Sequence, residues 1–230
     1  MAVTDTVESV DLAQVTLREL NRRLHERAPA PRWRISHPNG AHAVAVGIDA
    51  DIEVDVDGHV GYYCAGMNQH ATIRVHGNAG VGLAENIMSG TVVVDGYAGQ
   101  SCAATGRGGL VVVRGDASAR CGISMKGVDV VVAGSVGHMS AFMAQKGCLV
   151  VCGDAGEALG DSIYEARLYV RGSVASLGAD CVEKPMAEEH VDELHALLER
   201  AGFDADAGEF RRYGSARALY AFDVDNAGAY

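Results

Sequence analysis

The sequence has little proline, few aromatic residues and almost no lysine. Its 230 residues include 4 prolines and 6% aromatics, and its 19 basic residues are arginine except for three lysines. The formal net charge is −11, which is unfavourable for binding nucleic acid or an anionic membrane surface. There is also no basic-plus-apolar leader and no apolar run of about eighteen residues, so neither secretion nor membrane insertion is indicated. We therefore expect a cytoplasmic protein without a nucleic-acid or membrane partner.

Sequence motifs that mark catalytic or cofactor sites are also missing. There is no C-x-x-C pair, no phosphate-binding G-x-x-x-x-G-K-[ST] loop and no G-x-S-x-G nucleophile. The run Gly106-Arg107-Gly108-Gly109 fits a corner of a repeat better than a nucleotide cradle, and His190 and His195 lie five apart, the wrong spacing for one helical face. The sequence thus predicts no catalytic, cofactor-binding or metal-binding residue.

Six cysteines stand at irregular spacings, which is typical of reduced cytosolic thiols. Three of them, Cys64, Cys102 and Cys121, share one position of the repeat described below, so Cys102 and Cys121 should stack on adjacent coils. A zinc or iron–sulfur site would need further ligands close by, and the column supplies Leu83 and Ser140 instead. Buried, inert thiols are the favoured interpretation over a metal site.

What the chain does contain is glycine, 29 residues of it, much of it at a fixed period of nineteen. Valine stands two residues before every one of the periodic glycines, a branched aliphatic residue four before, and a small residue seven after. We call these seven positions the marker glycines: Gly58, Gly77, Gly96, Gly115, Gly134, Gly153 and Gly172. A constant period indicates one supersecondary unit stacked on itself.

The apolar residues before each marker glycine alternate with a period of two, which predicts a short strand. We expect the glycine to adopt a positive φ at a tight corner. The fold predicted is all-β, a single-stranded right-handed β-helix of about seven 19-residue coils, flanked by N- and C-terminal α-helices. At ~4.8 Å per coil it would form a rod about 34 Å long. A propeller or sandwich is the alternative, although propeller blades need about twice this period.

Three segments follow from this pattern. Residues 1–40 should form an N-terminal arm and capping helix, 41–182 the β-helix, and 183–230 a C-terminal helix and tail. Ser9 or Asp11 can cap the first helix, which would run to about Arg27.

The second helix should run from Glu188 to Arg200, with Gly202 as its stop. The prolines between the arm and the first coil predict an extended link, His42 to Ile48 should begin an imperfect first coil, and residues 203–230 should be irregular.

The column three residues before each marker glycine should point outward, yet four successive members are valine: Val93, Val112, Val131 and Val150. An exposed apolar stripe of this kind needs a cover. The candidates are the chain's own second helix, through Val191, Leu194 and Leu198, and a partner protein. The tail from Tyr213 to Phe222 is a further possible interface.

Three stretches carry a family resemblance: G-H-V-G-Y-Y-C-A-G-M-N at 58–68, R-C-G-I-S-M-K-G at 120–127 and S-A-F-M-A-Q-K-G at 140–147. They resemble the C-terminal GXGXG β-helix domain of glutamate synthase large subunits. The match spans residues 10 to 222 and is most similar to the free-standing form, the middle subunit of N-methylglutamate synthase.

The resemblance implies a non-catalytic scaffold subunit. Its expected partners are a glutamine amidotransferase-like subunit and an FMN-dependent glutamate synthase-like subunit, with FMN and the iron–sulfur cluster on a partner. Two alternatives stay open: the β-helix component of a formylmethanofuran dehydrogenase-type complex, and a stand-alone structural β-helix.

Overall fold

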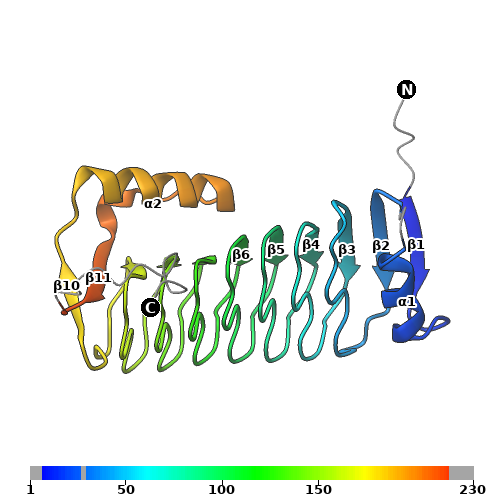
Figure 1. Cartoon of the computed structure of the whole chain (residues 1–230), viewed down its shortest axis with the longest axis horizontal. Coiled ribbons are helices and arrows are strands. Elements are labelled where there is room, and N and C mark those ends of the chain that lie inside the picture. The colour runs from blue at the N-terminus through cyan, green and yellow to red at the C-terminus, as the bar shows by residue number, and fades with distance from the viewer. Residues whose placement is uncertain (1–6, 27–29, 218–230) are drawn as a thin grey trace, which may run out of the picture.

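The computed structural model describes residues 7–26 and 30–217, which form a β-solenoid with a helix near each end (Figure 1). One eleven-stranded sheet runs along the rod in the order β1-β2-β3-β4-β5-β6-β7-β8-β9-β11-β10. The strands are β1 (Val7–Asp11), β2 (Arg32–Ser36), β3 (Glu53–Asp57), β4 (Thr72–Val75), β5 (Thr91–Val94), β6 (Leu110–Val113), β7 (Asp129–Val132), β8 (Cys148–Val151), β9 (Arg167–Val170), β10 (Cys181–Lys184) and β11 (Arg211–Ser215). The helices are α1 (Leu17–Leu24) and α2 (Glu188–Ala201), with a 3₁₀ turn at Ala207–Glu209. Within the described ranges, neither α-helix has the length and apolar character needed to cross a bilayer.

The nineteen-residue period is the register of the sheet. Strands β3 to β9 begin nineteen residues apart and pair in parallel, so that Val54 lies beside Ile73 and Ile73 beside Val92. The inward valine and aliphatic columns form the continuous buried core of the rod. Prediction of a β-helix of about seven coils is confirmed.

Each coil continues from its strand into what we call the turn limb, the thirteen residues that begin at the marker glycine. Its first part holds a one-residue bridge to the neighbouring coils, as at Val60 and Ala79. Farther on, the sign of φ alternates: Tyr63, Ala65 and Met67 have φ of 61°, 56° and 55°. The alternation directs the Tyr63 amide to Val81 O of the next coil (2.8 Å) and the Ala65 amide to Val44 O of the coil before (2.9 Å). Left-handed backbone thus falls at the small column, seven after the marker, and at two positions beside it.

The marker glycines are needed for a different reason from the one the sequence predicts. Of the seven, Gly58 alone has a positive φ in the described structure, at 137°. A Cβ on Gly77 would lie 2.7 Å from the backbone carbonyl carbon of Gly58, and one on Gly115 would lie 2.8 Å from Gly96 O. The expected positive φ is wrong for the other six, because what excludes a side chain is the close approach of stacked coils.

The N-terminal end also differs from expectation. Ser9 and Asp11 lie in β1, which pairs in parallel with β2 where an extended link was expected. The cap of α1 is Thr16, whose Oγ1 accepts a hydrogen bond from the Glu19 amide (3.2 Å). Residues 42–48 do not begin the first coil, since they follow β2 as turns and bends. Helix α1 is joined to this segment, where Asn21 Nδ2 donates to Ala43 O (2.8 Å).

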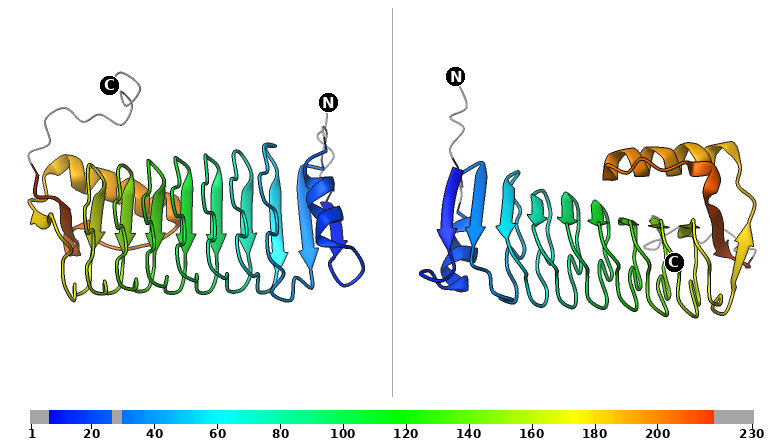
Figure 2. Two further views of the ribbon diagram at one scale, coloured as in Figure 1. Left: turned by 60° about the horizontal axis from the view of Figure 1, so that its bottom comes forward. Right: turned by 180° about the vertical axis from the view of Figure 1, so that it is seen from behind.

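At the C-terminal end, α2 agrees with prediction, but the chain after it is not irregular. Residues 211–215 form β11, which inserts antiparallel between β9 and β10. Tyr213, expected at an interface, is buried there as part of the main core. Phe222, the other tail residue proposed for an interface, lies outside the described residues. The views in Figure 2 show β10 and β11 together at one end of the solenoid and α1 at the other.

Candidate functional site

Helix α2 lies across the outer side of the sheet over the C-terminal coils (Figures 1 and 2). The outward residues Val112, Val131, Val150 and Tyr169 are buried there in a second apolar cluster with Leu194, Leu197, Leu198 and Ala201 of the helix. We call this region, the outer side of β6–β9, the covered face. Val191, expected to contribute, is 36% exposed instead.

The position of α2 shows which of the two candidates, the chain's own second helix or a partner protein, covers the valine stripe. Val112, Val131 and Val150 are at most 1% exposed, so they are unavailable to a partner in this structure. Val93, at the edge of the helix, stays half-buried and packs against the same cluster. Of the two covers that the sequence leaves open, the chain's own helix lies over these three valines.

Ionisable groups at the covered face serve to hold α2 in place. Glu193 of the helix accepts hydrogen bonds from the Tyr169 hydroxyl (2.5 Å) and from Arg167. Burial first, and then the Glu193 contact, raise the pKa of Tyr169 above its ordinary value. Burial likewise raises the pKa of the neighbouring Cys148 thiol, so that thiol is a poor nucleophile. These groups fasten the helix and lack the environment of an activated side chain.

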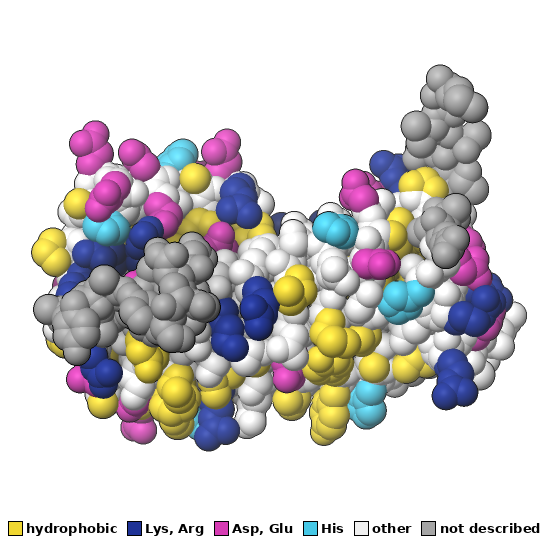
Figure 3. Space-filling view, in the orientation of Figure 1, with side chains coloured by type: hydrophobic (Ala, Val, Ile, Leu, Met, Phe, Trp, Pro, Cys, Tyr) yellow, Lys and Arg dark blue, Asp and Glu magenta, His cyan; other side chains and the backbone are white. Residues whose placement is uncertain are grey.

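The outer side of β3–β5 lies beyond the buried valines, with Val93 of β5 at its border, and we call it the open face. In Figure 3 histidine and carboxylate side chains lie on the upper surface of the molecule beyond α2. His76 lies between two carboxylates, with Nε2 2.8 Å from Asp55 Oδ1 and Nδ1 2.8 Å from Asp95 Oδ2. Arg74 Nη2 donates to the other oxygen of Asp95 at 2.8 Å.

The paired carboxylates set the protonation of this cluster. Burial alone would lower the pKa of His76, but its hydrogen bonds to Asp55 and Asp95 outweigh burial and raise it. Burial alone would raise the pKa of Asp95, yet hydrogen bonds from Arg74 and His76 leave that pKa lowered. The cluster thus favours a protonated imidazole hydrogen-bonded to both carboxylates, which ties three successive coils together.

Sequence reasoning missed the open-face cluster, although a signal exists. The column one residue before the marker glycines reads Asp57, His76, Asp95 and Arg114, groups of opposite sign at the spacing of adjacent coils. In a solenoid that spacing places side chains beside each other as surely as i, i+4 does in a helix.

The six cysteines occupy buried positions in the two apolar clusters. All six are free and buried, and Cys102 and Cys121 are neighbours on adjacent coils, as predicted. The hydrogen bond with Cys121, followed by burial, raises the pKa of Cys102, and burial raises the pKa of Cys64 to about 12. Over residues 7–26 and 30–217, no three His, Cys, Asp or Glu side chains converge as metal ligands would.

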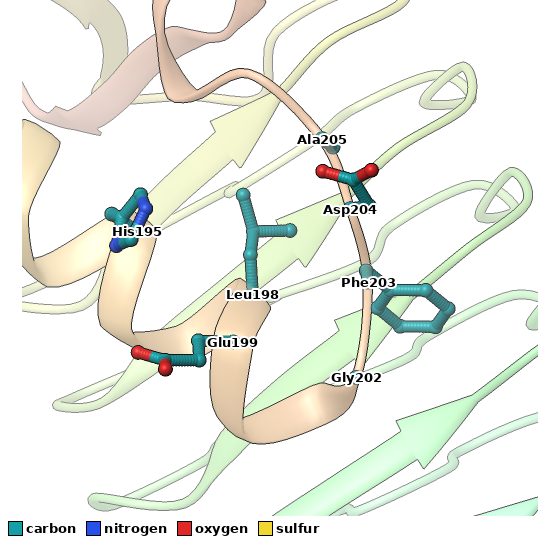
Figure 4. Close-up of a pocket in the computed structure, with 7 residues that line it drawn as sticks. All are labelled: His195, Leu198, Glu199, Gly202, Phe203, Asp204 and Ala205. Atoms are coloured by element: carbon teal, nitrogen blue, oxygen red, sulfur yellow. The ribbon is translucent and has the colours of Figure 1, made fainter.

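A hollow of about 380 Å³ lies at the end of α2 (Figure 4). It is lined by His195, Leu198, Glu199, Gly202, Phe203, Asp204 and Ala205. The Phe203 ring points away from His195 and Glu199, toward the sheet, where the Arg114 guanidinium stacks over it at 5.3 Å. The hollow is formed where the chain turns away from the end of α2, and the side chains that line it are spread around its rim.

Known proteins are similar to this chain in sequence and in fold. No protein-family model matches the chain. Its sequence is 60% identical over 225 residues to Protein GlxC of Rhizobium meliloti, covering 96% of this chain and 99% of that protein. Its fold is similar to that of a chain in the crystal structure of the formyltransferase/hydrolase complex (FhcABCD) from Methylorubrum extorquens in complex with methylofuran, with a TM-score of 0.51, 21% identity, and coverage of 87% and 86% of the two chains. The structural likeness establishes a shared fold, and the near full-length sequence identity establishes that this chain belongs to the GlxC family.

Proposed function

We propose that this chain is a non-catalytic structural subunit of a glutamate-synthase-like complex of the N-methylglutamate synthase type. In that role it holds an amidotransferase-type subunit and an FMN/iron–sulfur synthase-type subunit in register in the cytoplasm. Ammonia or an amine would then pass between their sites. FMN and the iron–sulfur cluster belong to the partner in this proposal.

The observation that carries the proposal is that the polar side chains described above join neighbouring coils or hold α2 against them. The open-face cluster of His76, Asp55 and Asp95 ties coil to coil, and Glu193 with Tyr169 fastens α2. The stretches that resemble the glutamate synthase β-helix are residues 58–68, 120–127 and 140–147. The first two lie within turn limbs, and the third ends one residue beyond its limb. These polar groups and turn limbs thus support a structural role for the solenoid.

A rigid body of this kind can contribute to a reaction through placement alone. Seven coils at ~4.8 Å make a rod about 34 Å long, which is enough to contact two domains at once. Holding two sites in a fixed relation replaces diffusion of an intermediate by transfer within one assembly, an effect that can be worth several kcal/mol.

Purification of the chain from its native cells, with an affinity tag on the chromosomal copy, tests the proposal. Mass spectrometry should identify an amidotransferase-like chain and a flavin-containing chain in fixed stoichiometry with it. Recovery with formyltransferase-type or hydrolase-type subunits would favour the formylmethanofuran-type alternative, for which the similarity of fold is the supporting observation. Recovery of filaments of the chain alone would favour the stand-alone structural role.

A further inference from the structure

The turn limbs that follow β3, β4 and β5 carry an exposed apolar patch. Five large side chains make it up: Tyr62 and Tyr97 are each 58% exposed, Met67 and Met88 each 45%, and Val81 42%. We call these five residues the turn-limb patch. Hydrophobic side chains also stand out along the lower edge of the solenoid in Figure 3, opposite the side that bears α2.

The same limbs are depleted of charge. Residues 58–70, 77–89 and 96–108 contain two charged residues, Glu85 and Arg107, whereas the next three limbs, 115–127, 134–146 and 153–165, contain eight. Charged residues make up 21% of the chain, so 39 residues would ordinarily hold about eight. Loss of charge together with exposed aromatic and methionine side chains is the composition of the centre of a protein interface.

Backbone hydrogen bonds hold these limbs directly against one another. The Tyr63 amide donates to Val81 O and the Ala79 amide to Tyr97 O, both at 2.8 Å. Tyr62 and Val81 occupy the same position of adjacent coils. The Tyr62 ring is also fixed by stacking on His42, with centroids 4.5 Å apart. The patch is therefore presented on a rigid support, and little ordering would accompany its binding to a partner.

Tyr97 departs from the rule of its own column. One residue after each marker glycine, a side chain accepts a hydrogen bond from the amide of the equivalent residue in the next coil: Asn78 from Tyr97 (2.9 Å), Asp116 from Ser135 (2.8 Å) and Asp154 from Ser173 (2.7 Å). His59 and Ser135 do the same. Tyr97 presents an exposed ring at this position in place of a bridging acceptor. Because that ring supplies no bridging acceptor and exposes 58% of its surface, it is suited to a contact outside the coil.

We propose that the turn-limb patch binds an uncharged, apolar surface of a different protein chain. Assigning that chain to the same assembly as another of its subunits rests on the proposed function. Five side chains exposing about 100 Å² each give on the order of 500 Å². That area falls short of the ~800 Å² per partner of a stable interface, so the patch is too small to sustain a symmetric dimer alone. It suits one anchor point of a larger subunit, with tyrosines as the anchoring side chains.

The repeat itself supplies substitutions that the fold accepts. Tyr97→Asn introduces the acceptor found at Asn78, and Tyr62→Gln with Val81→Gln introduces the side chain found at Gln100 of the same column. The triple variant removes three of the five patch side chains, including both tyrosines, and uses residues already found in these columns. The matched control changes the charged half in the same columns: Ser135→Asn, His138→Gln and Glu157→Gln.

The experiment replaces the chromosomal copy by the tagged wild type, the patch variant or the control, and weighs the intact assemblies by native mass spectrometry. We expect the control to retain every subunit. The patch variant should lose one subunit by at least about tenfold while its own melting temperature stays at or above that of the wild type. We expect no loss of stability because Asn at position 97 can accept a hydrogen bond from the amide of the equivalent residue in the next coil.

Three results would overturn the proposal: the patch variant retains all subunits at wild-type stoichiometry, the wild type is recovered without any other subunit, or the wild type is a dimer that the patch variant converts to a monomer. A lost subunit that is neither amidotransferase-like nor synthase-like would contradict the proposed function while supporting the docking patch.

Discussion

The coils beneath the covered face and those beneath the open face have the same backbone form, and they differ in their outward side chains. Three residues before successive marker glycines stand Asp55 and Arg74, then the four valines of the stripe, then Tyr169. The column changes from polar to apolar at Val93, which is where the cover by α2 ends. The comparison teaches that the backbone of the coil leaves the outer face undetermined, and that outward residues select between a packed helix and a solvent-exposed network of ion pairs.

Inward columns show no such change. Val54 and Val56 under the open face are as fully buried as Val130 and Val132 under the covered face. The rod is thus stabilised along its length by one core, while α2 adds a second core to one half. Substitutions in the two halves should therefore differ in their effect wherever α2 is involved.

The largest effect should come from a charge beneath α2. Val131→Asp places a carboxylate in a fully buried position within an apolar cluster and should lower the free energy of unfolding by several kcal/mol, because the charge loses its hydration there. Val93→Asp, in the same column at the half-buried edge, should cost less than about 1 kcal/mol. Urea denaturation of both variants measures the difference. Equal losses would mean that the cover extends over Val93 as well.

The contribution of the helix is measured by a pair of truncations within α2. Leu194 is fully buried against the sheet, so Leu194→Ala should cost about 2–4 kcal/mol. Val191 faces solvent over a third of its surface, and Val191→Ala should cost under about 1 kcal/mol. Thermal melting of the two variants tests the assignment, and a larger loss at Val191 would show that another face of α2 contacts the coils.

Marker glycines should be insensitive to the difference between the halves. Cβ atoms at Gly77 and Gly153 would each lie 2.7 Å from the backbone carbonyl of the preceding marker glycine. Both Gly→Ala variants should therefore lose more than about 1 kcal/mol, and by similar amounts. A neutral result at either position, again by urea denaturation, would contradict the close stacking of coils at that corner.

The smallest effect concerns the open face and depends on pH. The pKa of His76 is raised above its ordinary value of 6.5, so its contribution to stability is complete below about pH 6.5 and is lost as pH rises through the folded-state pKa. The stability difference between wild type and His76→Gln should accordingly be larger at pH 6 than at pH 9. The lowered pKa of Asp95 contributes a term that is lost only as pH falls below about 3.8, outside this range. A difference that grows toward pH 9 would exclude a protonated imidazole.

Much of the solenoid could be predicted from sequence because its information is periodic. Strand positions, inward columns and the apolar stripe all follow from the nineteen-residue repeat. The reason for the marker glycines could not be read in the same way, since a crowded backbone and a positive φ both select glycine. Left-handed residues such as Tyr63 and Met67 carry no sequence signal, because hydrogen bonds to the coils on either side impose their conformation.

The ends of the rod lay beyond the periodic signal. Strand β1 joins the sheet only through β2. Strand β11 lies between β9 and β10 although it follows them both in the chain, after α2. Such pairings depend on distant partners rather than local pattern. The candidate surfaces show the same limit. The stripe of valines follows from the repeat, but its cover by α2 depends on tertiary packing, and the turn-limb patch depends on the exposure of its side chains.

The claim that this chain works by placing two other subunits is tested most directly by turnover of a reconstituted assembly with and without it. Ammonia-dependent turnover of the synthase-type subunit should be unchanged when this chain is omitted, because the chain supplies no catalytic group in our account. Glutamine-dependent turnover, which requires transfer between subunits, should be lost and should return when the chain is added back. Loss of ammonia-dependent turnover on omission, or full glutamine-dependent turnover without the chain, would contradict the account.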